Sequence, residues 1–101
     1  MTTTSYSYAV VRKRGPSWDP SRAMHEQDAW DRHASFMNQL VAAGFVKLGG
    51  PLGDGEEILL LVQAASDAAI VTRLREDPWT PMGLLEIASV KRWEIRLGDD
   101  A

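Results

Sequence analysis

Alternating apolar and polar positions near the start of the chain predict a first strand. Residues 6–13 are rich in aromatic and β-branched side chains, and the run stops at Gly15-Pro16. One face of this strand would carry Tyr6, Tyr8 and Val10. The basic cluster Arg12-Lys13-Arg14 at its end is interpreted as a solvated edge.

The same alternation returns at the other end of the chain. The odd-numbered positions Leu85, Ile87, Trp93, Ile95 and Leu97 are apolar, whereas charged residues occupy even-numbered ones. This pattern predicts one long final strand, or a strand with a break near Ser89. Trp93 is then most simply a core residue.

Two segments have helical spacing instead. Between His25 and Ala43 the apolar stripe recurs at steps of three and four residues, and Gly44 supplies the stop. That stripe contains Trp30, His33, Met37, Leu40 and Val41. A second helix is predicted from the N-cap Ser66 to about Glu76, where Asp77-Pro78 forces its end.

Between the two helices the sequence predicts a hairpin. Residues 45–48 form a short strand that ends in Gly49-Gly50-Pro51, and a glycine-rich turn covers residues 52–56. The next strand, residues 57–64, contains the continuous apolar run 58–62. Both of its faces are therefore apolar, which is typical of a strand that is buried on both sides.

The predicted order is β-α-β-β-α-β, so the expected fold is α+β and ferredoxin-like: a four-stranded antiparallel sheet with both helices on one face. The apolar face opposite the helices would be exposed in a monomer. We therefore expect a homodimer in which two sheets pack face to face.

Composition limits the classes of function. The 101 residues are 45% apolar and 25% charged, as expected for a single domain over residues 1–101 with its core at about 6–97. No cysteine is present, and a net charge of −3 argues against nucleic-acid binding. The longest apolar run is too short to span a bilayer, and the first residues lack signal-peptide features, so we expect a cytoplasmic protein without a membrane partner.

His25 and His33 are the two histidines of the chain. On one continuous helix they would lie about 12 Å apart along the axis and about 80° apart around it. They could not share an ion, and nothing in the spacing of Asp or Glu supplies further ligands. We therefore expect no metal and no cofactor.

His33 is the candidate proton-transfer residue because it lies within the apolar stripe, where an unpaired imidazole is costly. Asp77 is its natural partner, at the end of the second helix. Two interpretations remain open: a catalytic pair, or a core histidine satisfied by a backbone carbonyl.

Loop residues could complete a site around this pair. The segment beginning Gly49-Gly50 leads into a strand rather than a helix and lacks Gly-Lys-Ser/Thr, which argues against a nucleotide loop. Its glycines serve turn geometry, with or without a ligand close to the backbone. Trp18 and Trp79 lie in loops beside the helices, and either close an apolar site or act as packing plugs.

Several segments together resemble the YCII-related (YciI-like) domain family. They are Tyr8-Ala-Val-Val, the stretch from Gln27 to Leu40 that contains His33, the stretch from Gly44 to Leu52 with Gly-Gly-Pro, and Asp77-Pro-Trp through to Trp93. The resemblance covers about residues 6–97. It implies a dimeric α/β barrel with a His and Asp pair, His33 and Asp77, in a cleft.

The resemblance and the residues together suggest a function. We expect a cofactor-independent enzyme, a lyase, isomerase or dehydrochlorinase-like protein, that acts on a small organic molecule. His33 and Asp77 would be catalytic, with substrate contacts from Trp30, Gly49, Gly50, Pro51, Pro78, Trp79 and Trp18. The alternative is a non-catalytic dimer that senses a small ligand or acts as an accessory protein, with a possible link to sigma-factor regulation.

Overall fold

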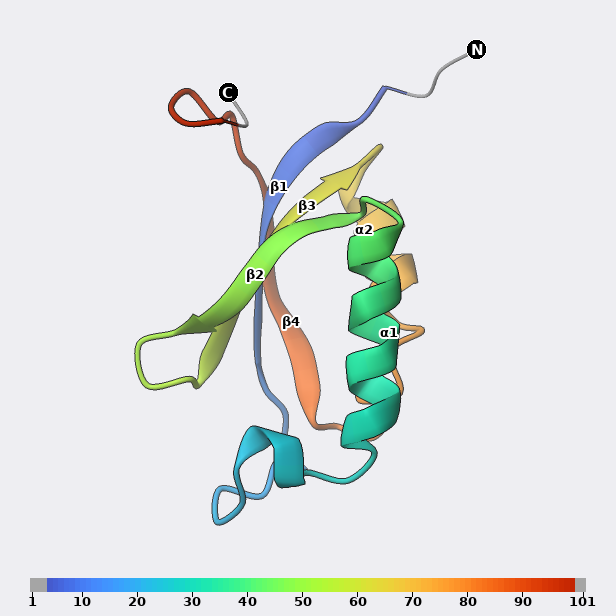
Figure 1. The fold of residues 1–101 in the computed structure, drawn as a ribbon, viewed down its shortest axis with the longest axis vertical. Helices are drawn as coiled ribbons and strands as arrows, with labels where there is room; N and C mark the ends of the chain where they lie inside the picture. Colours follow the sequence, from blue (N-terminus) through green and yellow to red (C-terminus); the bar gives the residue numbers. More distant parts are fainter. Residues whose placement is uncertain (1–3, 100–101) are drawn as a thin grey trace.

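The computed structural model describes residues 4–99. Its four strands form one antiparallel sheet in the order β2-β3-β1-β4, and both helices lie on the same side of it (Figure 1). This arrangement confirms the α+β, ferredoxin-like prediction. The elements are β1 (Tyr6–Arg14), the 3-10 helix η1 (Met24–Glu26), α1 (Trp30–Ala42), β2 (Val46–Leu52), β3 (Glu57–Ala64), α2 (Asp67–Leu74) and β4 (Leu85–Arg92).

The central strand β1 organises the core. Val10 pairs with Leu60 on one side and with Val90 on the other, so these three side chains share the face that the helices cover. Alternation along β1 places Tyr8 on the same face. Phe36 and Leu40 of α1 and Ile70 and Leu74 of α2 complete the main apolar cluster against this face.

The first predicted helix is divided in two, which corrects the prediction of one helix from His25 to Ala43. A one-turn 3-10 helix holds His25, and α1 begins only at Trp30. Ala29 separates them with a left-handed backbone, φ 58°. Because an α-helix cannot pass through that conformation, the two histidines lie on different elements, and the helical spacing predicted between them is wrong.

The hairpin also differs from the prediction. Gly49, Gly50 and Pro51 lie inside β2, which continues to Leu52, and the turn is confined to the residues before Glu57. A Cβ atom at Gly49 would lie 2.5 Å from Leu60 Cδ2. Gly49 is therefore required by close approach to β3 rather than by turn geometry.

The final strand is shorter than the alternation predicts. β4 ends at Arg92, and Trp93 is 39% exposed, so its assignment to the core is wrong. The break near Ser89 is present, because the register with β1 shifts between the Ser89 and Ile87 pairs. Alternation alone could not show that the chain leaves the sheet after Arg92.

The helix-free face of the sheet carries apolar side chains. By register, Leu48 lies opposite Leu61. Leu52 comes four residues later in β2, so its side chain is on the same face. Leu48 is 58% exposed and Leu52 40%. Figure 1 shows α1 and α2 on the opposite side of the sheet. In residues 4–99 no helix has the length and apolar character needed to cross a membrane.

Candidate active site

Two elements distant in sequence bring His33 and Asp77 together. His33 lies in the first turn of α1, and Asp77 lies three residues after α2 ends at Leu74. His33 Nδ1 is 2.8 Å from Asp77 Oδ2 and 3.0 Å from Oδ1, and both side chains are buried. The imidazole therefore meets a carboxylate, not the backbone carbonyl of the alternative interpretation.

The local sequence explains where the Asp77 carboxylate points. The Asp77 N–H donates to the Leu74 carbonyl, 3.1 Å away, which continues the chain beyond α2 for one more turn. Asp77 Oδ1 then accepts the N–H of Trp79 at 2.9 Å, an Asx-type turn. Pro78 between them cannot extend the helix. The Asp-Pro-Trp segment thus fixes the carboxylate against α1.

Asp77 also accepts a charged hydrogen bond from β1. Arg12 Nη1 donates to Asp77 Oδ2 at 2.8 Å, and Arg12 is 1% exposed. The interpretation of Arg12 as part of a solvated edge is wrong. Arg12 lies two residues after Val10, so the alternation along the strand places its side chain on the buried face. This alternation could have identified Arg12 as buried from the sequence.

These contacts determine the charge of Asp77. Burial disfavours the ionised carboxylate and by itself would raise its pKa. Hydrogen bonds from His33, from Arg12 and from the Trp79 N–H outweigh burial, so the pKa of Asp77 lies below its ordinary value of 3.8. Asp77 is therefore ionised throughout the neutral range.

Aromatic rings support the imidazole. Trp79 stacks on His33 with ring centroids 3.9 Å apart and an interplanar angle of 3°. The Trp79 indole N–H donates to the Asp28 carbonyl at 2.6 Å, which fixes the ring. Trp18 packs edge-on against Trp79 at 5.8 Å, and Trp30 lies 5.8 Å from His33.

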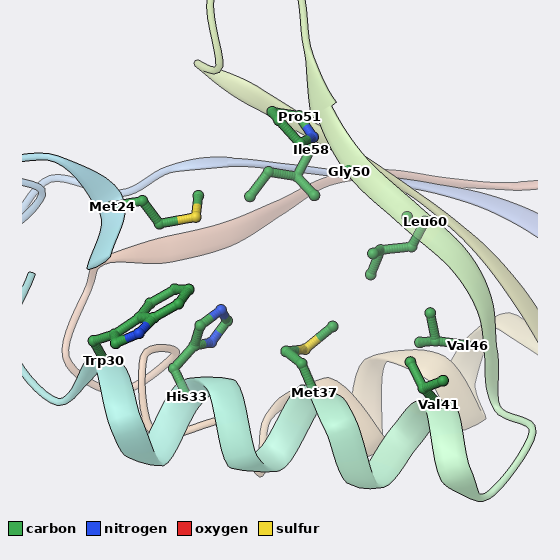
Figure 2. A pocket seen from close by; sticks show the side chains of 11 residues that line it. Met24, Trp30, His33, Met37, Val41, Val46, Gly50, Pro51, Ile58 and Leu60 are labelled. Atoms are coloured by element: carbon green, nitrogen blue, oxygen red, sulfur yellow. The ribbon is translucent and has the colours of Figure 1, made fainter. Parts of the chain in front are cut away.

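His33 also borders an apolar cavity of about 220 Å³ between α1 and the β2–β3 hairpin. Figure 2 shows its ring standing on α1 between Trp30 and Met37 and pointing into the cavity. The remaining walls come from η1, the end of α1 and the two strands: Met24, Val41, Val46, Gly49, Gly50, Pro51, Ile58 and Leu60. Among the described residues that line the cavity, His33 is the one whose side chain carries a titratable group.

The residues predicted for substrate contact fall into two groups. Trp30, Gly49, Gly50 and Pro51 line the cavity together with His33. In the described part of the chain Trp18, Pro78 and Trp79 are not in its walls: Trp79 lies behind the imidazole and Trp18 behind Trp79. The sequence did not point to Met24, Ile58 or Leu60 as cavity residues, because strand and loop patterns do not show which core positions border a void.

The groups that could bind a metal ion are dispersed. Over residues 4–99 no cluster of three or more His, Asp and Glu side chains is arranged to hold one. The Asp77 carboxylate is already hydrogen-bonded to Arg12 and His33 and is not available to a cation.

The chemistry that the His33–Asp77 arrangement supports is proton transfer at His33 Nε2, since Nδ1 faces the carboxylate.

Comparisons with known proteins agree with the fold. No family model matches the chain, and a search of curated proteins found no match. One solved structure that resembles it is 5-chloro-2-hydroxyhydroquinone dehydrochlorinase from Burkholderia phenoliruptrix AC1100 in complex with 2,5-dihydroxybenzoquinone. The TM-score is 0.62 at 23% sequence identity, over 93% of this chain and 97% of that chain. At this identity the likeness shows a related fold.

Proposed function

We propose that the protein is a cofactor-independent enzyme that removes a proton from a small oxygenated organic molecule, as a lyase or an isomerase. The observation that carries the proposal is the position of His33. Its Nδ1 is held by Asp77 at 2.8 Å, while its ring borders an apolar cavity of about 220 Å³. A base oriented by a carboxylate beside a ligand-sized space is the usual arrangement for general acid–base catalysis.

In the proposed reaction the Nδ1–H of His33 donates to Asp77, so the lone pair of Nε2 is free to accept a proton. The substrate loses that proton from carbon or oxygen. Its electron pair then forms a double bond, either with loss of a leaving group such as chloride or with reprotonation elsewhere on the ring. Asp77 stabilises the imidazolium that forms, and Trp79 keeps its plane fixed.

The structural resemblance supports the choice of substrate class. The dehydrochlorinase binds a six-membered dihydroxybenzoquinone. A cavity of about 220 Å³ accommodates a single substituted ring.

Exposed leucines on the helix-free face further support a homodimer with two such sites. Under the family resemblance, the two subunits would assemble as a dimeric α/β barrel.

A turnover panel tests the proposal. Small hydroxylated aromatics, chlorinated hydroquinones and lactones are incubated with the protein and followed by NMR. We expect turnover of at least one class, a loss of about 10²-fold or more in His33→Gln, and no change in the control His25→Gln, whose side chain is exposed on η1. Binding near His33 without turnover would contradict an enzyme and favour the ligand-sensing alternative.

A further inference from the structure

Arg12 is the charged residue that sequence reasoning left outside the site, and it is held there from two sides. Nη1 donates to Asp77 at 2.8 Å, and Nη2 lies 3.4 Å from Thr80 Oγ1. The Thr80 hydroxyl donates its own hydrogen to the Leu74 carbonyl at 2.8 Å, so its lone pairs are left for the guanidinium. These contacts fix the Arg12 side chain against the carboxylate.

We infer that Arg12 is a positioning residue that sets the charge state of His33 through Asp77. The inference rests on the proposed function, in which His33 must be neutral to accept a proton. Asp77 Oδ2 accepts from Arg12 and from His33 at the same distance, 2.8 Å. The imidazole therefore faces a neutral Arg-Asp pair instead of an unbalanced carboxylate. Asp77 orients the ring, and Arg12 limits how strongly that carboxylate favours the imidazolium.

Within residues 4–99, two charged groups face His33 from the elements packed against it: Asp77, after α2, and Arg12, on β1. On α1 itself Asp31 and Arg32 are exposed, where solvent screens their charges. The N-terminal end of α1 adds a partial positive charge that acts in the same direction as Arg12.

Stability alone does not account for this ion pair. Buried pairs are commonly no more stabilising than apolar side chains of the same size, because both charges lose their hydration. Within residues 4–99 Arg12 Nε is buried and has no hydrogen-bond partner, a cost that an apolar residue would avoid. A buried cation at this place is explained by its effect on Asp77 and His33.

Histidine ¹⁵N NMR tests the inference without any substrate. Arg12→Gln keeps a donor for Asp77 and removes the charge, whereas Arg12→Lys is the matched control that keeps it. We expect Arg12→Gln to raise the imidazolium-to-imidazole ratio of His33 near neutral pH by about tenfold, with Arg12→Lys close to the native protein. His25 on η1 is exposed and serves as the internal reference.

A second pair of variants covers the case in which Arg12→Gln does not fold. Asp77→Asn alone is compared with Asp77→Asn plus Arg12→Gln, where no carboxylate is left unpaired. With no carboxylate left to transmit the effect, removing the cation in this background should change the protonated fraction of His33 by much less than tenfold. An unchanged ratio in folded Arg12→Gln overturns the inference, and so does a tenfold change in the Asp77→Asn pair. Because no turnover is measured, this result is distinct from a failure of the proposed enzyme activity.

Discussion

Asp77 is the residue on which most polar contacts of the site depend. It receives hydrogen bonds from His33, Arg12 and the Trp79 N–H while fully buried. Asp77→Ala leaves the Arg12 guanidinium buried without its counter-charge. We expect the free energy of unfolding to fall by about 3–5 kcal/mol, measured by urea denaturation.

The matched control is Glu76→Ala, one residue earlier. Glu76 is exposed and pairs with Arg73 on the surface, so its removal should cost less than about 1 kcal/mol. Equal effects of the two substitutions would contradict the assignment of Asp77 as the centre of a buried network.

The lowered pKa of Asp77 predicts how stability depends on pH. Because the folded state binds this proton less readily than the unfolded state, the contribution of Asp77 is present above its ordinary pKa of 3.8. It is lost as pH falls below 3.8 towards the lowered value. Urea denaturation at a series of acidic pH values should show a shallower decline in Asp77→Asn than in the native protein. Identical slopes would contradict the pKa assignment.

At the residue scale, sequence reasoning found the partners but not the whole network. Asp77 could be named as the partner of His33 because the helix dipole disfavours a negative charge at a helix C-terminus. A carboxylate at that position therefore indicates a role beyond ending the helix. Arg12 was missed because a run of three basic residues was interpreted as one unit, although alternation distinguishes them. Lys13, its neighbour, does lie at the surface, paired with Glu86.

At the scale of elements, Gly49 of β2 lies close against β3. A Cβ added there meets Leu60 Cδ2 at 2.5 Å and the Leu59 carbonyl at 3.1 Å, whereas a Cβ at Gly50 meets nothing within 4 Å. Gly49→Ala should therefore destabilise the protein by about 1–3 kcal/mol, since the buried Leu60 must move. Gly50→Ala should change stability by less than about 0.5 kcal/mol.

Thermal denaturation of the two variants checks this prediction. Both glycines border the cavity. A difference in stability between the two variants therefore reflects packing against β3 and not the position beside the cavity. If Gly50→Ala proves as destabilising as Gly49→Ala, the close contact between the strands does not explain the glycine at position 49.

Element boundaries show what the sequence could not provide. Ser66 was correctly predicted as the N-cap of α2, and its Oγ accepts the Ala69 N–H at 3.1 Å. The start of α1 was wrong because it depends on Gln27, a buried side chain that donates to the carbonyls of Asp19 and Arg22. These hydrogen bonds join segments of the loop before α1, and no local propensity encodes them.

At the scale of the whole molecule, the order of strands and helices was sufficient to predict the fold. What covers the helix-free face is a separate prediction. Leu48 and Leu52 on β2 are exposed there. We expect sedimentation at micromolar concentration to give a species of twice 11.2 kDa, and Leu48→Glu to shift it to the monomer. A native protein that sediments only at 11.2 kDa would contradict the homodimer.

The most direct test of the account is the tautomer of His33 in the native protein, observed by ¹⁵N NMR near neutral pH. The central claim is that Asp77 holds Nδ1–H and leaves the Nε2 lone pair for the cavity. The account predicts that the neutral form of the ring is protonated at Nδ1 and unprotonated at Nε2. A neutral ring protonated at Nε2 would contradict it, because its lone pair would then lie on Nδ1, facing Asp77 and not the cavity.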